Sequence, residues 1–133
     1  MGNTIQVKIQ PQADRPGMYT VTPHGPIDSD TYVSFNDKVQ PLLVDSTKAI
    51  VLNLADVDYI SSAGLGVLFT MKKFLKQKNG DLLFSNLKPQ IKRLFEIVNA
   101  LPSETLFAST EEADAYLYKM MQQEIDKQEN DDR

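Results

Sequence analysis

The chain has 133 residues, of which 41% are apolar and 24% charged, and its formal net charge is −4. It contains no cysteine, which excludes disulfides, thiolate catalysis and cysteine metal ligands. The negative charge argues against a nucleic-acid partner, and every apolar run is far shorter than the ~18 residues of a membrane span. The N-terminal segment lacks an apolar signal core, so we expect one cytoplasmic domain.

The N-terminal segment has the pattern of a β-hairpin. Ile5, Val7 and Ile9 alternate with polar residues, as in a strand with one buried face. Pro16-Gly17 is a turn sequence, and strand-forming residues resume at 18–21. These residues therefore predict two strands joined by a tight turn.

The next segment predicts a helix and then a buried strand. Apolar residues of 32–43 recur with a helical period, and Asp28 or Ser29 is expected to cap this helix. Pro41 lacks an N–H group and clashes one turn back, so we expect a kink or two helical pieces there. The dense apolar run at 48–57 predicts a strand buried on both faces and parallel to a neighbour.

The second half of the chain continues to alternate helices with short strands. Asn79-Gly80 ends the first helix, Pro89 suits the start of the second, and Ser109–Glu112 forms a capping box for the last. Residues 127–133 form a polar tail that is expected to fray. The expected helices contain 65–75, 91–98 and 113–125, and the expected strands lie at 81–87 and 104–109. This order predicts a single α/β domain with a mixed sheet of four to five strands and about four helices.

Ser61 and Ser62, which we call the serine corner, stand where the buried strand gives way to the following helix. In open α/β sheets, functional sites gather at the carboxyl ends of strands. The simplest interpretation is an N-cap that satisfies one free N–H group of the helix. A hydrolase nucleophile is poorly supported, because Ile60 stands where G-x-S-x-G requires glycine and His24 is the only histidine.

Two further interpretations involve phosphate. The sequence SSAGLG (61–66) has the spacing of neither G-x-x-x-x-G-K-[ST] nor G-x-G-x-x-G, so a nucleotide site is weakly supported. A regulatory phosphoserine fits better, because a helix N-terminus favours negative charge. Asp28, Asp56 and Asp58 are expected at the same edge of the sheet, so a phosphate there could switch a binding surface without catalytic residues. The sequence shows no carboxylate pair and no metal-ligand cluster near the corner. It therefore gives little support to a metal site or to a small-molecule enzyme.

Three stretches of the sequence resemble the STAS domain family: VLNLADVDYISSAGLGVLF (51–69), NGDLLFSNLKPQIKRLFEIVNA (79–100) and GPID (25–28). The chain looks most similar to the free-standing bacterial anti-sigma factor antagonists of that family. The resemblance extends from about residue 5 to about residue 118. It implies a STAS domain over 1–118, followed by a C-terminal helix extension and polar tail over 119–133.

The resemblance implies partner switching without enzyme activity or a cofactor. In such families the unphosphorylated antagonist binds an anti-sigma factor that is also a GHKL-type serine kinase, phosphorylation of one serine releases it, and a serine phosphatase restores the antagonist. The acceptor position, two residues before the matching glycine, falls on Ser62. Ser61 is the second choice, in a place where many members have Asp. The implied partner-binding residues are Asp28, Asn53, Ser61, Gly64 and Leu65.

The alternative is a STAS module that is never phosphorylated. It would act as an adaptor in a signalling or transporter complex, and both residues of the serine corner would serve only as helix caps. Neither interpretation requires a metal, a nucleic-acid partner or a membrane partner.

Overall fold

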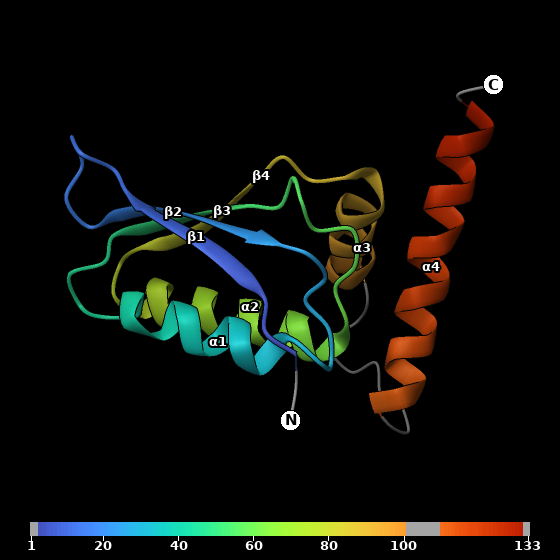
Figure 1. Ribbon diagram of the computed structural model, residues 1–133, viewed down its shortest axis with the longest axis horizontal. Coiled ribbons are helices and arrows are strands. Elements are labelled where there is room, and N and C mark those ends of the chain that lie inside the picture. Colours follow the sequence, from blue (N-terminus) through green and yellow to red (C-terminus); the bar gives the residue numbers. More distant parts are fainter. Residues whose placement is uncertain (1–2, 101–109, 132–133) are drawn as a thin grey trace.

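Four strands form one mixed sheet in the part of the chain that the structure describes, residues 3–100 and 110–131 of a computed structural model. β1 (Gln6–Pro11) and β2 (Met18–His24) form the predicted hairpin, with antiparallel pairing. β3 (Ala49–Asn53) pairs parallel to β2, and β4 (Asp81–Ser85) pairs parallel to β3 (Figure 1). The carboxyl ends of β2, β3 and β4 therefore meet at one edge of the sheet.

Two helices cover one face of this sheet, and two stand near the carboxyl ends of its parallel strands. α1 (Tyr32–Val39) and α2 (Ser62–Gln77) lie side by side below the sheet in Figure 1. α3 (Pro89–Ala100) and α4 (Thr110–Asp131) pack together beyond the end of the sheet. A short 3₁₀ helix, Gln40–Leu42, continues from α1, which confirms the two helical pieces expected around the proline in its middle.

The prediction that the third strand is buried on both faces is wrong. Ile50 and Leu82 share a row that faces the helices, and both are fully buried. The next row across β2, β3 and β4 is Thr20, Val51 and Leu83, in which Leu83 is 48% exposed. Burial alternates along β3 because α1 and α2 both lie on one side, and the described helices leave the other side open (Figure 1).

The cap predicted for α1 also needs correction. Thr31 occupies the N-cap position, and Asp28 and Ser29 lie in the turn before the helix. Oδ1 of Asp28 accepts hydrogen bonds from the backbone N–H groups of Asp30 (2.9 Å) and Thr31 (3.1 Å). Asp28 therefore organises the turn that leads into the helix, as short polar side chains do.

Helix α2 ends where the sequence predicts. Asn79 adopts a left-handed conformation with φ of 62°. The Gly80 N–H donates to the Leu75 carbonyl (2.7 Å), and the Asn79 N–H donates to the Lys76 carbonyl (3.2 Å). This pair of hydrogen bonds is a Schellman motif, which satisfies carbonyls that the end of a helix leaves free.

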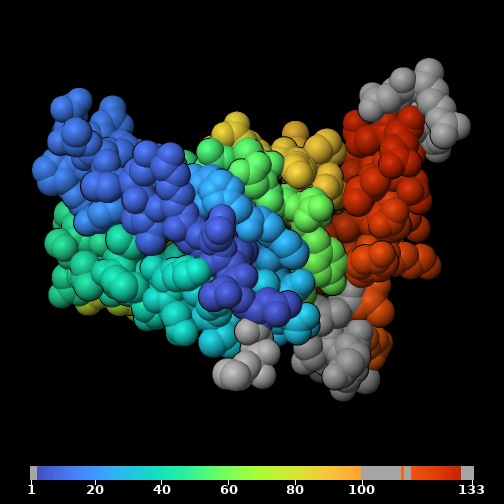
Figure 2. Space-filling view, in the orientation of Figure 1, coloured from blue at the N-terminus to red at the C-terminus, as the bar shows by residue number. Residues whose placement is uncertain are grey.

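Helix α4 crosses residue 118, where the sequence suggested that the domain ends. Leu117 and Met121 lie on either side of that position, and both are buried in the main hydrophobic core. Residues 127–131, which were expected to fray, are helical. Figure 2 shows α4 standing upright at one end of the molecule. The strand expected at 104–109 and the first residue of the predicted capping box lie outside the described residues.

Candidate functional site

One backbone bridge joins the loop after β2 to the loop after β3. The Ile27 N–H donates to the Tyr59 carbonyl (3.0 Å), and the Ser61 N–H donates to the Ile27 carbonyl (3.0 Å). This exchange makes Ile27 and Ile60 an isolated parallel pair, and both side chains are fully buried. Asp28, the next residue along the chain, is thereby held beside the serine corner.

Gly64 allows the start of α2 to approach this bridge. A Cβ at Gly64 would lie 2.3 Å from the Ile27 carbonyl oxygen and 3.0 Å from Cγ2 of Ile60, so only glycine fits. Gly66 is different, because a Cβ there would meet no atom within 4 Å. The fold itself therefore requires glycine at the first position and not at the second.

The two serines have different surroundings. Ser61 is the N-cap of α2: its hydroxyl accepts the Gly64 N–H at 3.3 Å, and the residue is only 3% exposed. The capping interpretation is therefore confirmed for Ser61. Ser62 is the first residue of the helix and is less deeply buried. Its position beside the first-turn N–H groups suits an anionic group.

Three aspartates lie in the loops near the serine corner, at the same edge of the sheet. Asp28 is part of the turn described above, and Asp58 lies in the loop that leads to the corner. Nδ1 of His24 donates a 2.7 Å hydrogen bond to the Asp56 carboxylate, and both residues are exposed. This pairing accounts for the only histidine of the chain without a catalytic serine.

The remaining predicted partner-binding residues lie at the same edge but are not all accessible. Oδ1 of Asn53 accepts hydrogen bonds from the Ala55 N–H and from Nδ2 of Asn86, both at 3.1 Å. Asn53 thus ties the loop after β3 to the loop after β4. Gly64 is buried, and Leu65 is 4% exposed and packs in the hydrophobic core. These two buried residues therefore support the serine corner and are not exposed to a partner.

Several grooves border the site. One groove runs along the edge of the sheet, where Asp28, Asp58 and Tyr59 face Tyr118 of α4. The rings of Tyr59 and Tyr118 meet edge to face, with their centroids 5.8 Å apart, so α4 contacts the loop that carries the serine corner. A second groove, of 460 Å³, lies between α1 and α2 and begins beside Ala63. Sequence reasoning missed this groove, because its walls come from helices about thirty residues apart.

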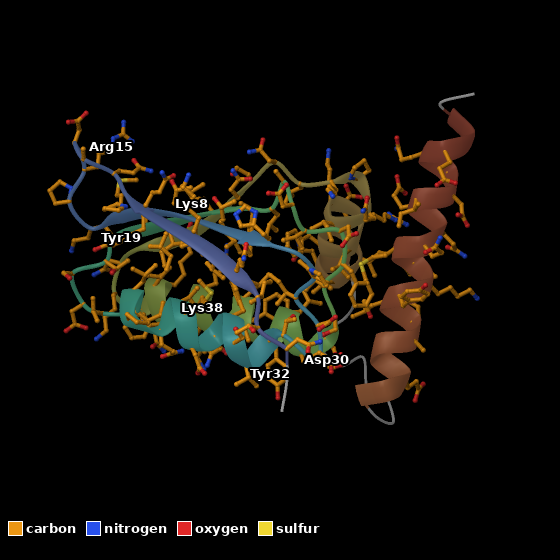
Figure 3. All side chains as sticks on the ribbon, viewed as in Figure 1. Lys8, Arg15, Tyr19, Asp30, Tyr32 and Lys38 are labelled. Atoms are coloured by element: carbon orange, nitrogen blue, oxygen red, sulfur yellow. The ribbon has the colours of Figure 1, made fainter. Side chains whose placement is uncertain are left out.

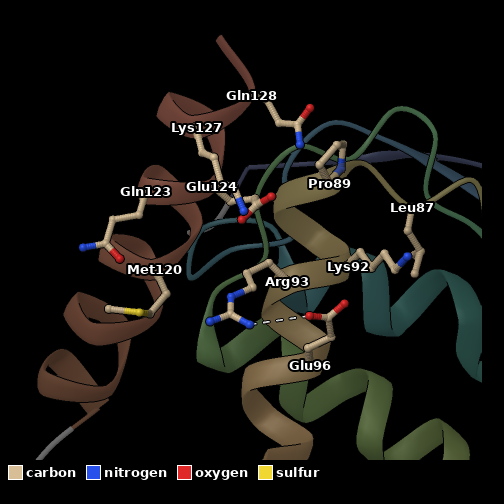
Figure 4. A pocket seen from close by; sticks show the side chains of 10 residues that line it. All are labelled: Leu87, Pro89, Lys92, Arg93, Glu96, Met120, Gln123, Glu124, Lys127 and Gln128. Atoms are coloured by element: carbon tan, nitrogen blue, oxygen red, sulfur yellow. Dashed lines mark ion pairs between the residues drawn. The ribbon is translucent and has the colours of Figure 1, made fainter. Parts of the chain in front are cut away.

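A third groove, of 680 Å³, separates α3 from α4 (Figure 4). Its lining carries charges of both signs, and Arg93 and Glu96 of α3 form an ion pair of 3.5 Å within it. None of the predicted site residues lines this groove. The described ranges, 3–100 and 110–131, hold no cluster of three His, Asp or Glu side chains suited to a metal ion. None of the described helices has the length and apolar character that a membrane span requires.

The sequence profile of the STAS domain matches residues 5–113. The chain belongs to the STAS domain family. The anti-sigma-B factor antagonist of Staphylococcus aureus is 34% identical over 79 residues, which cover 59% of this chain and 73% of that relative. BtrV of Bordetella bronchiseptica, provisionally named an anti-sigma factor antagonist, is 33% identical over 103 residues, which cover 77% of this chain and 88% of BtrV.

Solved structures share the fold at lower identity. SpoIIAA, the Bacillus cell fate determinant, in its phosphorylated form is 18% identical with a TM-score of 0.55, over 80% of this chain and 96% of that chain. A likeness at this identity shows the fold alone. Together with the mixed four-stranded sheet, it confirms the predicted STAS fold.

Proposed function

We propose that this STAS protein is an anti-sigma factor antagonist whose binding is switched by phosphorylation of Ser62. The relatives described above carry the name of that function. The observation that carries the proposal is the position of Ser62, the first residue of α2, next to the bridge that holds Asp28 in place. The protein would act in the cytoplasm as a kinase substrate and a binding module, not as an enzyme.

The geometry favours Ser62 over Ser61 as the acceptor. The Ser61 hydroxyl already accepts a helix N–H, so a phosphate there would remove the cap of α2. Ser62 is the first residue of α2 and is not its N-cap. Its hydroxyl oxygen is buried, so it must rotate toward solvent to accept a phosphate, and this rotation leaves the Ser61 cap in place. A kinase then transfers the γ-phosphoryl group of ATP to the Ser62 oxygen, and ADP and a proton leave.

The added phosphate would act mainly on the loops around it. It adds a charge of about −2 to the edge of the sheet that already holds Asp28 and Asp58. Repulsion would push these carboxylates outward, and the bulk of the phosphate would block a partner seated on α2. Asp28 and Asn53 are proposed to contact the anti-sigma factor, and the buried Gly64 and Leu65 to support that surface.

The test begins with the GHKL-type serine kinases of the host organism. Each is purified and incubated with ATP and the wild-type chain, and phosphopeptides are mapped by mass spectrometry. We expect one kinase to place a phosphate that disappears in Ser62→Ala and persists in Ser61→Ala. Removal of that phosphate by a host serine phosphatase completes the cycle.

Calorimetry with that kinase then tests the switch. Ser62→Ala should bind as wild type does, and Ser62→Asp should bind at least ~10-fold more weakly. Ser62→Thr is the matched control, because it keeps an acceptor hydroxyl. A host partner that binds wild type and Ser62→Asp equally, in the presence or absence of ATP, would refute the switch and favour the adaptor alternative.

A further inference from the structure

The groove between α1 and α2 presents an apolar surface next to the serine corner. Tyr32 and Val33 of α1 form one rim and are 36% and 51% exposed. Ala63 and Gly66 of α2 form the floor, and Ala63 directly follows Ser62. None of the described side chains that line this groove is charged.

Gly66 makes the groove deeper than the fold requires. Glycine inside a helix is less stable than alanine by about 1 kcal/mol. At Gly64 a collision with the Ile27 carbonyl explains the absence of a side chain, but at Gly66 a Cβ would meet nothing within 4 Å. The missing side chain at Gly66 therefore leaves a hollow that no described part of this chain fills.

Two hydrogen bonds already engage polar side chains of the groove. Nε2 of Gln40 donates to Oδ1 of Asn36 at 2.9 Å, across one turn of the α1 segment. The Thr70 hydroxyl donates to the Gly66 carbonyl at 2.9 Å, which leaves its methyl group for the wall. An apolar occupant would therefore deprive none of these hydrogen bonds of a partner.

One end of the groove is acidic. Asp30 lies beside Tyr32 at the start of α1, on the side away from the sheet (Figure 3), and Asp28 lies in the same turn. Asp30 is exposed. An occupant that carries a basic side chain beside an apolar one would match both the acidic end and the neutral floor.

We propose that this groove is the docking site for an apolar side chain of the anti-sigma factor, flanked by a basic residue that faces Asp28 and Asp30. The inference rests on the proposed function and names the surface that it uses. Ser62 directly precedes Ala63 of the groove floor, and its neighbour Ser61 is hydrogen-bonded to Ile27, the residue before Asp28. A phosphate on Ser62 competes with Asp28 and Asp30 for the basic residue of the partner, and its bulk keeps the apolar side chain out of the hollow at Gly66.

Two substitutions at Gly66 test whether filling the groove weakens partner binding without destabilising the fold. Gly66→Ala should raise the unfolding temperature by about 2–5 °C, because it improves helix propensity in open space. In calorimetry with the host GHKL-type kinase that phosphorylates wild type, the same variant should bind ~3-fold more weakly and Gly66→Leu at least ~10-fold more weakly. Gln77→Leu, at the far end of the same helix, is the matched control and should bind within ~2-fold of wild type.

The outcomes distinguish failure of the groove proposal from failure of the proposed phosphorylation switch. If Gly66→Leu melts as wild type does and binds the kinase equally well, while Ser62→Asp does not bind, the groove proposal fails and the proposed function stands. If Gly66→Leu instead dissociates a wild-type dimer in sedimentation and kinase binding is unchanged, the occupant is a second copy and the proposal is overturned. If no host kinase binds wild type, both proposals fail together.

Discussion

The paired glycines at the start of α2 give a sharp test of the site geometry. In Gly64→Ala the new Cβ would lie 2.3 Å from the Ile27 carbonyl oxygen, about 1 Å inside a normal C···O contact of ~3.3 Å. The loop that carries Ile27 must move to relieve this contact. That movement strains the two 3.0 Å hydrogen bonds that tie Ile27 to Tyr59 and Ser61.

The magnitude follows from three contributions. Two weakened hydrogen bonds cost about 1 kcal/mol each, and the overpacked contact costs about 1–3 kcal/mol. The better helix propensity of alanine returns about 1 kcal/mol. Gly64→Ala should therefore lower the free energy of unfolding by about 2–4 kcal/mol, whereas Gly66→Ala should raise it by up to ~1 kcal/mol.

Urea unfolding followed by far-ultraviolet circular dichroism measures both variants under identical conditions. The two substitutions are chemically identical and lie two positions apart in one helix, so propensity cancels in their difference. If Gly64→Ala were as stable as Gly66→Ala, the close approach of α2 to the Ile27 loop would not exist. The position assigned to Asp28 beside Ser62 would then lose its support.

Four further variants have expected outcomes in the same assay. Ser61→Ala should cost about 1 kcal/mol by removing the cap of α2, and Ser62→Ala less than ~0.5 kcal/mol. The ammonium group of Lys76, 3.1 Å from Asp81, lowers the pKa of Asp81, so this pair stabilises the fold above the ordinary carboxyl pKa and the benefit disappears as pH falls through the lowered value. Asp81→Asn should therefore flatten the acid limb of the stability curve slightly, since the carboxylate is partly exposed; an unchanged limb would contradict this. Leu117→Ala should cost about 2–4 kcal/mol, and a cost near zero would mean that α4 is detached from the core.

The sequence predicted the mixed sheet, and the edge at which its candidate site lies, for a physical reason. Parallel strands bring their carboxyl ends to one edge, so Asp28 and the serine corner were expected together although they are more than thirty residues apart. The helix stop at Asn79 and the break at Pro41 were predictable because each depends on local backbone chemistry.

Features that depend on distant packing could not be predicted in this way. Val51 is as apolar as Leu52, and only the placement of both covering helices on one side leaves Val51 on the open face. Leu65 follows the site motif directly, but the rotation of α2 buries it in the core. Gly64 and Gly66 look equivalent in sequence, and only the path of the Ile27 loop distinguishes them.

The Schellman motif at the end of α2 has a chemical consequence. Asn-Gly sequences in flexible peptides deamidate readily, because the glycine nitrogen attacks the asparagine side-chain carbonyl to form a succinimide. Here the Gly80 N–H is held by the Leu75 carbonyl at 2.7 Å, and Asn79 is fixed in a left-handed conformation. Succinimide formation therefore requires the end of α2 to open. The rate at which isoaspartate accumulates at Asn79 during storage thus reports how often this end of the helix unfolds locally.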